Sequence, residues 1–513
     1  MASEVAGALD RRDLPADTVE REKRRGADGG PVPSNVDWYR SLSGATRAKL
    51  GPRVLRKPTR TLSGVAIVAV MTSPAACPHG KCTYCPGGPE ANSPQSYTGE
   101  EPSALRGAQY GWDARAITLD RLRVLSTIGH PTSKVEAIVM GGTFPDRPKA
   151  YRDRVLLGIF EGLNGAPSST LPEAQAVNEI SAHRLVSLTV ETRPDRCDGR
   201  ILPDLLEAGV TRVEIGVECL SEDVLERVHR AHGVDDVARA TREARDRGLK
   251  VAYHLMLGLP GMTPERDLAD FRRLFDDPAF RPDMLKIYPT LVLPGTGLYE
   301  AWKAGAFRPY ETDTAAELLA EMKRIVPPWV RIQRIQRDIP ARLIADGVRT
   351  SNLRQLALAR LAELGGRCRC LRCREPGRRA TPSASEFIRR ETDYPAAGGR
   401  EHFVSFEDPT TDTVAGFLRL RFPSDATEGG LTVPVVRELK VLGAEVPVAA
   451  PARGPLDYQH RGFGKALLAR AEEIVRGSGF RRIAVLSAVG TRGYYRSLGY
   501  ATDGPHMGKA VFA

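Results

Sequence analysis

The chain has 513 residues, of which 42% are hydrophobic and 27% are charged, and this composition predicts two to four globular domains. Its 74 basic and 63 acidic residues give a net charge of +11, which favours a polyanionic partner such as nucleic acid. No apolar run is long enough to span a bilayer and no secretory signal opens the sequence, so a cytoplasmic protein without a membrane partner is expected.

Residues 1–50 are predicted to form a basic, largely disordered arm. They are rich in Gly, Asp and Arg, lack hydrophobic periodicity and contain the basic run REKRR at residues 21–25. This run suits a nucleic-acid contact and a solvated tail equally well, and the sequence leaves both interpretations open.

Residues 51–345 are expected to form a parallel α/β domain. Six β-rich runs alternate with helix-length segments, which predicts a parallel sheet curled into a six-stranded partial (βα) barrel. In such barrels the reactive residues lie at the C-terminal ends of the strands. The runs span residues 64–72, 134–142, 185–193, 211–218, 250–258 and 283–291.

Residues 346–380 and 381–513 are predicted to form a connector and a second, smaller α/β domain. The connector has a helix-like stretch over residues 352–364, followed by the cysteine-rich GGRCRCLRC. The last region shifts to runs typical of antiparallel strands at 402–408, 414–422 and 435–442. A glycine turn and a helix over residues 459–475 follow them.

The eight cysteines indicate metal sites rather than disulfides. Six of them form two tight trios, while Cys197 and Cys219 stand alone, and such clustering in a cytosolic chain is typical of metal ligands. The first trio is Cys77, Cys82 and Cys85, and the second is Cys368, Cys370 and Cys373.

The first trio suits an iron–sulfur cluster. Three thiolates hold three irons of a 4Fe–4S cluster and leave the fourth iron open to an outside ligand. The C-x4-C-x-Tyr84-C spacing resembles the C-x3-C-x-aromatic-C motif of the radical S-adenosylmethionine (SAM) superfamily, with one extra residue in the first gap. Gly141-Gly142-Thr143 resembles the segment that receives the SAM amino group there. A zinc site with a distant fourth ligand is the alternative.

The segment QHRGFGK at residues 459–465 resembles the diphosphate-binding turn of GNAT acetyltransferases. Backbone N–H groups at the start of the following helix would bind the pyrophosphate of acetyl-CoA, and the glycines would allow its close approach. The later GYYRSLGY supports this resemblance, because a Tyr there commonly lies near the CoA sulfur. Core packing is the alternative for one of Tyr494 and Tyr495.

With both halves present, the chain resembles the Elongator catalytic subunit family, fusions of radical SAM and acetyltransferase domains that modify wobble uridines of tRNA. The resemblance covers about residues 55–510 and includes the segments YCPGGPE, SPQSYTGEEPSALR, KVEAIVMGGTFPD, LKIYPTLVLPGTGLYE, QHRGFG and YYRSLGY. It implies a tRNA carboxymethyluridine synthase, in which SAM-derived radical chemistry and acetyl-CoA place a carboxymethyl group on C5 of the wobble uridine.

The resemblance also implies roles for individual residues. The first cysteine trio would hold the 4Fe–4S cluster, and the second resembles a zinc site, for which free thiols are the alternative. Lys134 would contact acetyl-CoA from the radical SAM side. The cofactor-binding residues would be Tyr84, Gly141, Gly142, Thr143, Glu191, Lys134, Glu438, Leu439, Lys440, Val441, Gly462, Phe463, Gly464, Lys465 and Tyr495, and the catalytic residues Lys286, Tyr288 and Tyr495.

A protein lysine acetyltransferase with a structural iron–sulfur domain is the alternative function. It would need a general base beside the thioester, and no carboxylate stands out for that role. A radical methylthiotransferase is disfavoured because no further cysteines precede Cys77. The expected partners are tRNA through its anticodon stem-loop, acetyl-CoA and an unidentified electron donor. The choice of tRNAs, the residue that hydrolyses the thioester and the formation of a homodimer stay open.

Overall fold

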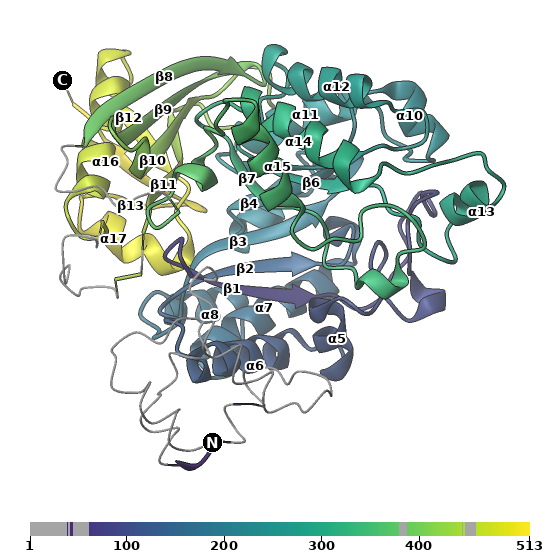
Figure 1. Ribbon diagram of the computed structural model, residues 1–513. Coiled ribbons are helices and arrows are strands. Elements are labelled where there is room, and N and C mark those ends of the chain that lie inside the picture. Colours follow the sequence, from purple (N-terminus) through teal and green to yellow (C-terminus); the bar gives the residue numbers. More distant parts are fainter. Residues whose placement is uncertain are drawn as a thin grey trace.

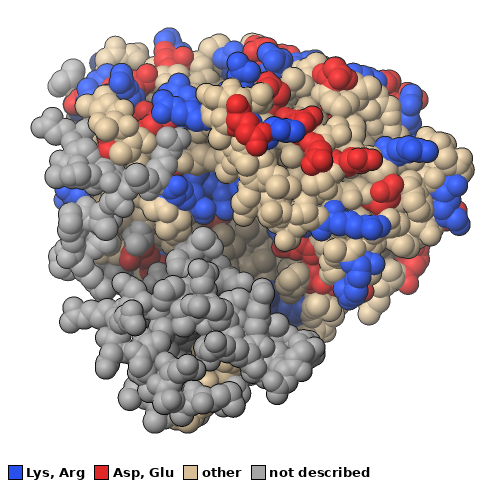
Figure 2. Space-filling view, in the orientation of Figure 1, with Lys and Arg blue, Asp and Glu red and all other residues tan. Residues whose placement is uncertain are grey.

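The computed structural model describes residues 61–378, 387–443, 445–446 and 458–512, together with Trp38 and residues 42–44. Apart from Trp38 and residues 42–44, the predicted basic arm therefore lies outside the described residues. Figure 2 shows Lys and Arg side chains interspersed with Asp and Glu over the described part of one face.

The first of two sheets is a seven-stranded parallel half-barrel whose strands follow one another in sequence order (Figure 1). The six predicted strands are confirmed, and a seventh was missed. The strands are β1 (Ala66–Met71), β2 (Lys134–Met140), β3 (Arg184–Thr192), β4 (Arg212–Glu218), β5 (Lys250–Leu257), β6 (Met284–Pro289) and β7 (Arg331–Ile335). β4 and β5 are buried over nearly their whole lengths, although both carry buried charged residues, Arg212 and Glu214 on β4 and Lys250 on β5.

Helices accompany this sheet on its outer side (Figure 1). They are α5 (Pro102–Gln109), α6 (Ala114–Thr127), α7 (Lys149–Asn164), α8 (Leu171–Asn178), α9 (Leu202–Glu207), α10 (Glu222–Arg227), α11 (Val234–Arg245), α12 (Pro264–Asp276), α13 (Gly297–Lys303), α14 (Thr312–Ile325) and α15 (Leu353–Glu363). The start of α12 shows how the sequence begins such a helix. The Thr263 hydroxyl accepts a hydrogen bond from the N–H of Arg266, and Pro264 occupies the first turn. Among the described residues, no helix is long and apolar enough to cross a membrane.

The second sheet also has seven strands, in the order β13-β14-β12-β11-β10-β9-β8. Its neighbours are antiparallel except for the parallel pair β11 and β12, so the antiparallel runs expected from the sequence are confirmed. Its elements are β8 (Ile388–Ala396), β9 (Gly399–Asp408), β10 (Thr413–Phe422), β11 (Val435–Val441), α16 (Phe463–Gly477), β12 (Arg482–Val485), α17 (Arg492–Arg496), β13 (Ala501–Asp503) and β14 (His506–Ala510).

The second sheet docks on the N-terminal ends of the half-barrel strands (Figure 1). One close approach is at Gly490, which lies in a 3-10 turn (Val489–Thr491) before α17. A Cβ on Gly490 would lie 2.7 Å from the carbonyl oxygen of Leu185 in β3, so only glycine fits there without displacing the backbone. Within the described residues, short 3-10 turns connect the larger elements at Pro89–Ala91, Phe144–Asp146, Pro194–Arg196, Ala341–Leu343, Leu371–Arg374 and Val489–Thr491.

Candidate active site

The first cysteine trio lies in the loop after β1, at the C-terminal edge of the half-barrel. Cys82 and Cys85 are buried and Cys77 is half-buried. The three sulfurs do not all lie within 4.8 Å of one another, unlike those of the connector trio in the described part of the chain. Thiolates 2.3 Å from a single zinc ion would lie about 3.8 Å apart. The wider spacing therefore suits a multi-iron cluster better than a zinc ion.

Every sulfur of this trio has a polar neighbour, as expected for an iron–sulfur site. The neighbours are Thr143 Oγ1 for Cys77 (3.8 Å), His79 Nε2 (3.3 Å) and Arg230 Nη1 (3.8 Å) for Cys82, and Gln95 Nε2 (3.4 Å) and Ser96 Oγ (3.5 Å) for Cys85. Burial, and then the nearby charge of Arg193, lowers the pKa of His79 to about 4, so this imidazole is neutral at neutral pH.

The glycine segment after β2 lies against the cysteine loop, as predicted for segments that follow the C-terminal ends of neighbouring strands. Gly141 and Gly142 have φ values of +127° and +95°, which L side chains rarely adopt. A Cβ on Gly141 would lie 2.1 Å from the Thr72 hydroxyl. The N–H of Gly141 donates to Glu191 Oε2 at 3.2 Å. The structure thus brings together the cysteine loop, the glycine segment and Glu191.

Sequence reasoning missed Tyr97, which fixes Glu191 from the other side. Its hydroxyl donates to both carboxylate oxygens of Glu191, at 2.9 and 3.1 Å. Tyr97 belongs to the same SPQSYT segment as Gln95 and Ser96. The segment shows neither the hydrophobic periodicity of a helix nor that of a strand. A polar segment without such periodicity, close to the cysteines in sequence, is the signal that would have pointed to a site.

A group of charged side chains fills the interior of the half-barrel next to Glu191. The carboxylate of Glu214, fully buried on β4, accepts hydrogen bonds from Lys286 Nζ and, at 3.1 Å, from His254 Nε2. Burial alone would raise the pKa of Glu214, but Lys286, His254 and Arg212 hold it well below 4.5. Ligand atoms of Glu191, Glu214 and His254 lie within 4.8 Å of one another, yet the adjacent cations balance the carboxylates and make a further metal ion unfavourable.

Two predicted catalytic residues, Lys286 and Tyr288, lie on β6 in or beside this group. The ring of Tyr288 stands edge-on to His254, with 5.8 Å between the ring centroids. The geometry thus places Lys286 and Tyr288 at the barrel interior, and their catalytic role stays a prediction. His254 and Glu214, which the sequence did not single out, connect to them directly.

The predicted acetyl-CoA loop has the geometry of an anion site at a helix N-terminus. α16 begins at Phe463, directly after Gly462 at φ +89°. Among the described residues, the parallel pairing of β11 with β12 covers only Val435 and Val436. The N–H groups at the start of a helix have no partners within the helix, so those of α16 would suit a diphosphate, and the end of β11 near them would suit an acyl chain.

The remaining residues predicted to contact acetyl-CoA occupy different surroundings. Glu438 is ion-paired with Arg419 at 2.9 Å, toward the half-barrel. Tyr495 is buried in the core of the second sheet, whereas Tyr494 is 38% exposed. A Cβ on Gly464 would lie 2.9 Å from the Tyr494 hydroxyl, so Tyr494 is the tyrosine that faces the loop. The assignment of Tyr495 to the thioester stays a prediction.

Lys134, the first residue of β2, reaches the acetyl-CoA loop from the half-barrel. Its ammonium donates to Gln459 Oε1 at 2.7 Å and to the carbonyl oxygen of Val446 at 2.8 Å. Gln459 opens the QHRGFGK turn, so the half-barrel supports that turn directly. In this structure Lys134 is bonded to the turn itself.

The connector trio forms a compact, mostly buried group. The ligand atoms of Cys368, Cys370 and Cys373 lie within 4.8 Å of one another, a spacing that a single metal ion can bridge. The ammonium of Lys323 donates to Cys368 Sγ at 3.4 Å and to Cys373 Sγ at 3.6 Å. Among the described residues, no fourth His, Cys, Asp or Glu joins this group.

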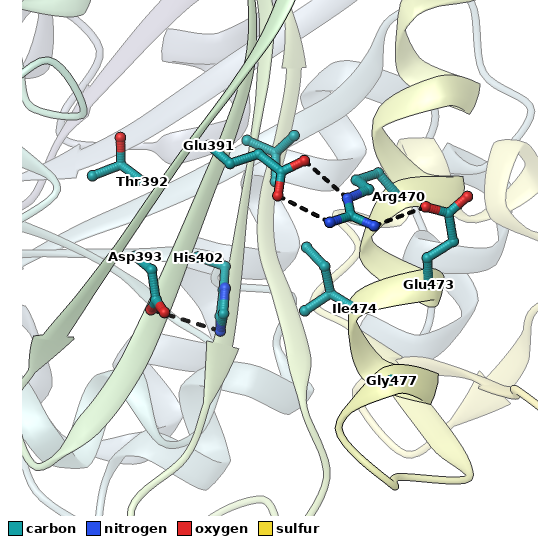
Figure 3. A pocket seen from close by; sticks show the side chains of 9 residues that line it. Glu391, Thr392, Asp393, His402, Arg470, Glu473, Ile474 and Gly477 are labelled. Atoms are coloured by element: carbon teal, nitrogen blue, oxygen red, sulfur yellow. Dashed lines mark hydrogen bonds and ion pairs between the residues drawn. The ribbon is translucent and has the colours of Figure 1, made fainter.

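A hollow on the outer side of the second sheet, between α16 and the β8–β9 edge, is not a candidate site (Figure 3). Its charged groups are paired with one another. Arg470 bonds Glu391 at 2.9 Å and Glu473 at 3.0 Å, and His402 lies 3.7 Å from Asp393. No charged group of the hollow is left over to recognise a ligand.

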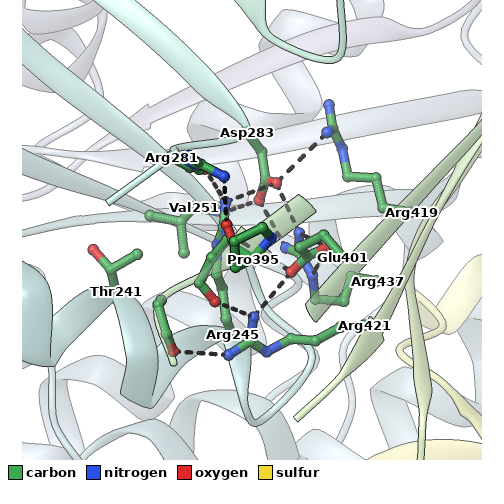
Figure 4. Close-up of polar contacts among 12 residues, drawn as sticks. Thr241, Arg245, Val251, Arg281, Asp283, Pro395, Glu401, Arg419, Arg421 and Arg437 are labelled. Atoms are coloured by element: carbon green, nitrogen blue, oxygen red, sulfur yellow. Dashed lines mark hydrogen bonds and ion pairs between the residues drawn. The ribbon is translucent and has the colours of Figure 1, made fainter. Parts of the chain in front are cut away.

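An interdomain ionic cluster holds the two sheets together (Figure 4). Asp283, before β6, accepts from both amino groups of Arg437, at 2.7 and 2.8 Å, and from Arg245 at 3.2 Å. Nearly all of its side chains are fully buried. The cluster comprises Arg245, Asp246 and Asp283 from the half-barrel, and Glu401, Arg419, Arg421, Arg437 and Glu438 from the second sheet.

The two candidate sites lie at opposite ends of the half-barrel. Lys134, bonded to the acetyl-CoA loop, starts β2, and Gly141, beside the cysteine loop, follows its end. Seven residue steps at about 3.3 Å each separate them by roughly 23 Å. Fold and site together define a protein that joins a radical SAM half-barrel to a GNAT-type acetyltransferase sheet.

Comparison with known proteins agrees with this class. The Radical SAM superfamily model matches residues 71–274, the Radical SAM C-terminal domain model residues 282–363, and the Acetyltransferase (GNAT) family model residues 371–500. These families imply SAM, an iron–sulfur cluster and acetyl-CoA as bound groups.

Full-length relatives narrow the class to one family. The chain is 44% identical to the tRNA uridine(34) acetyltransferase of Methanocaldococcus jannaschii, over 93% of this chain and 90% of the relative. It is 46% identical to human Elongator complex protein 3 over the same shares. The solved structure of the archaeal Methanocaldococcus infernus Elp3 matches with a TM-score of 0.78 and 41% identity, over 88% of this chain and 100% of that chain. The chain belongs to the Elongator complex protein 3 family, which confirms the resemblance seen in the sequence.

Proposed function

We propose that this chain is a tRNA-modifying enzyme of the cytoplasm that places a carboxymethyl group on C5 of the wobble uridine, using SAM-derived radical chemistry and acetyl-CoA. The observation that carries the proposal is the union of both sites in one structural unit, with Lys134 of the half-barrel bonded to the acetyl-CoA turn. The names of the relatives support a tRNA uridine substrate. The net charge of +11 supports a partner rich in phosphates.

The chain's own residues would hold the bound groups at the two ends of the half-barrel. Cys77, Cys82 and Cys85 would bind the cluster, which would supply the electron that cleaves SAM to a 5′-deoxyadenosyl radical. Gly141 and Gly142 leave space for the SAM amino group, and the N–H groups at the start of α16 would bind the acetyl-CoA diphosphate.

In the overall reaction, the acetyl methyl carbon would lose a hydrogen atom to the radical formed from SAM, which becomes 5′-deoxyadenosine, and would bond to C5 of the uridine. The C5 hydrogen would then leave as a proton together with one electron, which replaces the electron used to cleave SAM. Water then cleaves the thioester and CoA leaves. Because Lys134 and Gly141, at the two ends of β2, are about 23 Å apart, the acyl group would have to approach the cluster end before the carbon–carbon bond can form. The wobble base also has to leave its stack to enter the site.

The lysine acetyltransferase alternative is weaker in this geometry. Burial alone would raise the pKa of Glu438, but Arg419 and Lys250 hold it below 4.5. A carboxylate with a lowered pKa is a weak general base, and its ion pair with Arg419 directs it toward the half-barrel. We also propose that Cys368, Cys370 and Cys373 hold a structural zinc ion, because their spacing suits one.

The test is anaerobic incubation of the reconstituted full chain with tRNA, SAM, acetyl-CoA and a one-electron reductant, followed by mass spectrometry of the wobble nucleosides. Carboxymethyluridine should form, and it should be absent when SAM is omitted. The same protein should be incubated with lysine peptides and acetyl-CoA. Peptide acetylation without any nucleoside product would establish the alternative.

A further inference from the structure

Arg230 lies beside the cysteine loop, and nothing in the proposed function uses it. Its side chain is buried, with Nη1 at 3.8 Å from Cys82 Sγ and Nη2 donating to the carbonyl oxygen of Gly216 at 2.6 Å. A Cβ on Gly216 would lie 2.3 Å from Nη2 of Arg230. β4 therefore carries a glycine where the guanidinium group needs the room.

The backbone around Arg230 is strained on both sides. His229 has a φ of +57° and Ala231 a φ of +55°, although neither is a glycine. Glu218, at the end of β4, has a φ of +69°. Such left-handed conformations are unfavourable for residues other than glycine and persist where the surrounding structure imposes them, often at functional sites. The chain thus accepts strain to place this guanidinium group.

The carboxylate of Glu218 opposes the charge of Arg230. Glu218 Oε1 lies 3.1 Å from Nη2, whereas Cys82 Sγ lies on the Nη1 side. The pair therefore turns its positive end toward the sulfur. Because Arg230 is buried and the Glu218 side chain is only 11% exposed, water screens this charge only weakly.

We propose that Arg230 is a positioning residue that raises the reduction potential of the iron–sulfur cluster held by Cys82, and that Glu218 limits this effect. Reduction adds one negative charge to the cluster, and a nearby cation with an N–H···S contact stabilises the reduced form. The inference rests on the cluster of the proposed function. It requires neither acetyl-CoA nor tRNA.

The test is a potentiometric titration of the anaerobically reconstituted full chain, with the electron paramagnetic resonance signal of the reduced cluster as readout. Arg230→Gln removes the charge but keeps an N–H donor, and Glu218→Gln removes the opposing charge. The matched control is Arg331→Gln, because Arg331 is also buried and ion-paired, at 2.7 Å to Glu375, but starts β7 at the other end of the half-barrel.

At the midpoint of the wild-type protein, Arg230→Gln should lower the ratio of reduced to oxidised cluster at least tenfold, which equals about 59 mV for one electron. Glu218→Gln should shift the ratio in the opposite direction, and Arg331→Gln should leave it unchanged. Shifts of equal sign in the first two variants, or none, would overturn the proposal. If Arg230→Gln fails to hold iron, the direction of the Glu218→Gln shift decides alone. If the RNA reaction fails but the reduction potentials of the variants shift as expected, this inference stands.

Discussion

The interdomain ionic cluster predicts that Asp283→Asn destabilises the whole chain. The carboxylate of Asp283 is fully buried and accepts from Arg437, Arg245 and the N–H of Val251. Asn keeps one acceptor oxygen but turns an N–H₂ group toward guanidinium groups that have lost a balancing charge. Removing one partner of a buried ion pair costs about 3–5 kcal/mol, and we expect a loss of that size.

The assay is urea unfolding followed by circular dichroism, with Asp223→Asn as the matched control. Asp223 makes an ion pair of 2.8 Å with Arg266, but its side chain is 54% exposed, so its loss should cost at most about 1 kcal/mol. Equal losses in the two variants would refute the argument that burial gives the Asp283 contacts their strength.

The same substitution should change the response to acid. Burial alone would raise the pKa of Asp283, but Arg437, Arg245 and Arg419 hold it well below its ordinary value of 3.8. A carboxyl group with a lowered pKa stabilises the fold above its unfolded pKa, and this contribution is lost as the pH falls below that value. Between pH 5 and about pH 3 the wild-type protein should therefore lose more stability than Asp283→Asn.

Three further predictions concern single positions. Gly490→Ala should lower the thermal midpoint, because the new Cβ meets the Leu185 backbone, whereas Gly493→Ala, three residues away in open space on α17, should leave it unchanged or raise it. Gly141→Ala should abolish SAM cleavage, since its Cβ would meet the Thr72 hydroxyl, while circular dichroism stays that of the wild type; retained cleavage would contradict the assignment of this segment. Cys370→Ser should lower zinc content and thermal stability without loss of the iron absorbance, and anaerobically purified wild-type protein that contains no zinc would contradict it.

Apolar periodicity made most of the fold predictable from the sequence. The buried strands of the half-barrel are rich in apolar and β-branched residues, and the strand-end rule placed the cysteine loop, Gly141 and Glu191 at one edge. β7 was missed because its sequence, RIQRI, is short and has only two apolar residues, with Arg331 committed to an ion pair with Glu375. A short, mostly polar run of this kind does not resemble the other six.

The polar contacts of the site could not be predicted in the same way. Arg230 and Cys82 are 148 positions apart, and Glu214 and Lys286 are 72 apart. Nothing in the local pattern distinguishes these charged residues from surface ones, because burial and pairing arise only when the strands are assembled. The motif at 459–465 was found because its glycines are needed by the local backbone, as at Gly462, whose φ is +89°. The contact of Lys134 with Gln459 instead depends on the docking of the two sheets.

The interdomain ionic cluster also bears on how the two halves can be inherited. Separated, the second sheet would carry three arginines against two glutamates, an excess of one positive charge, and the half-barrel one arginine against two aspartates, an excess of one negative charge. Neither half can exchange its charges without a matching change in the other. A chimera of halves from two relatives should therefore assemble only when both carry the same arrangement of charges. Recombination within this chain is therefore constrained by the charges at the interface between its two sheets as well as by its candidate sites.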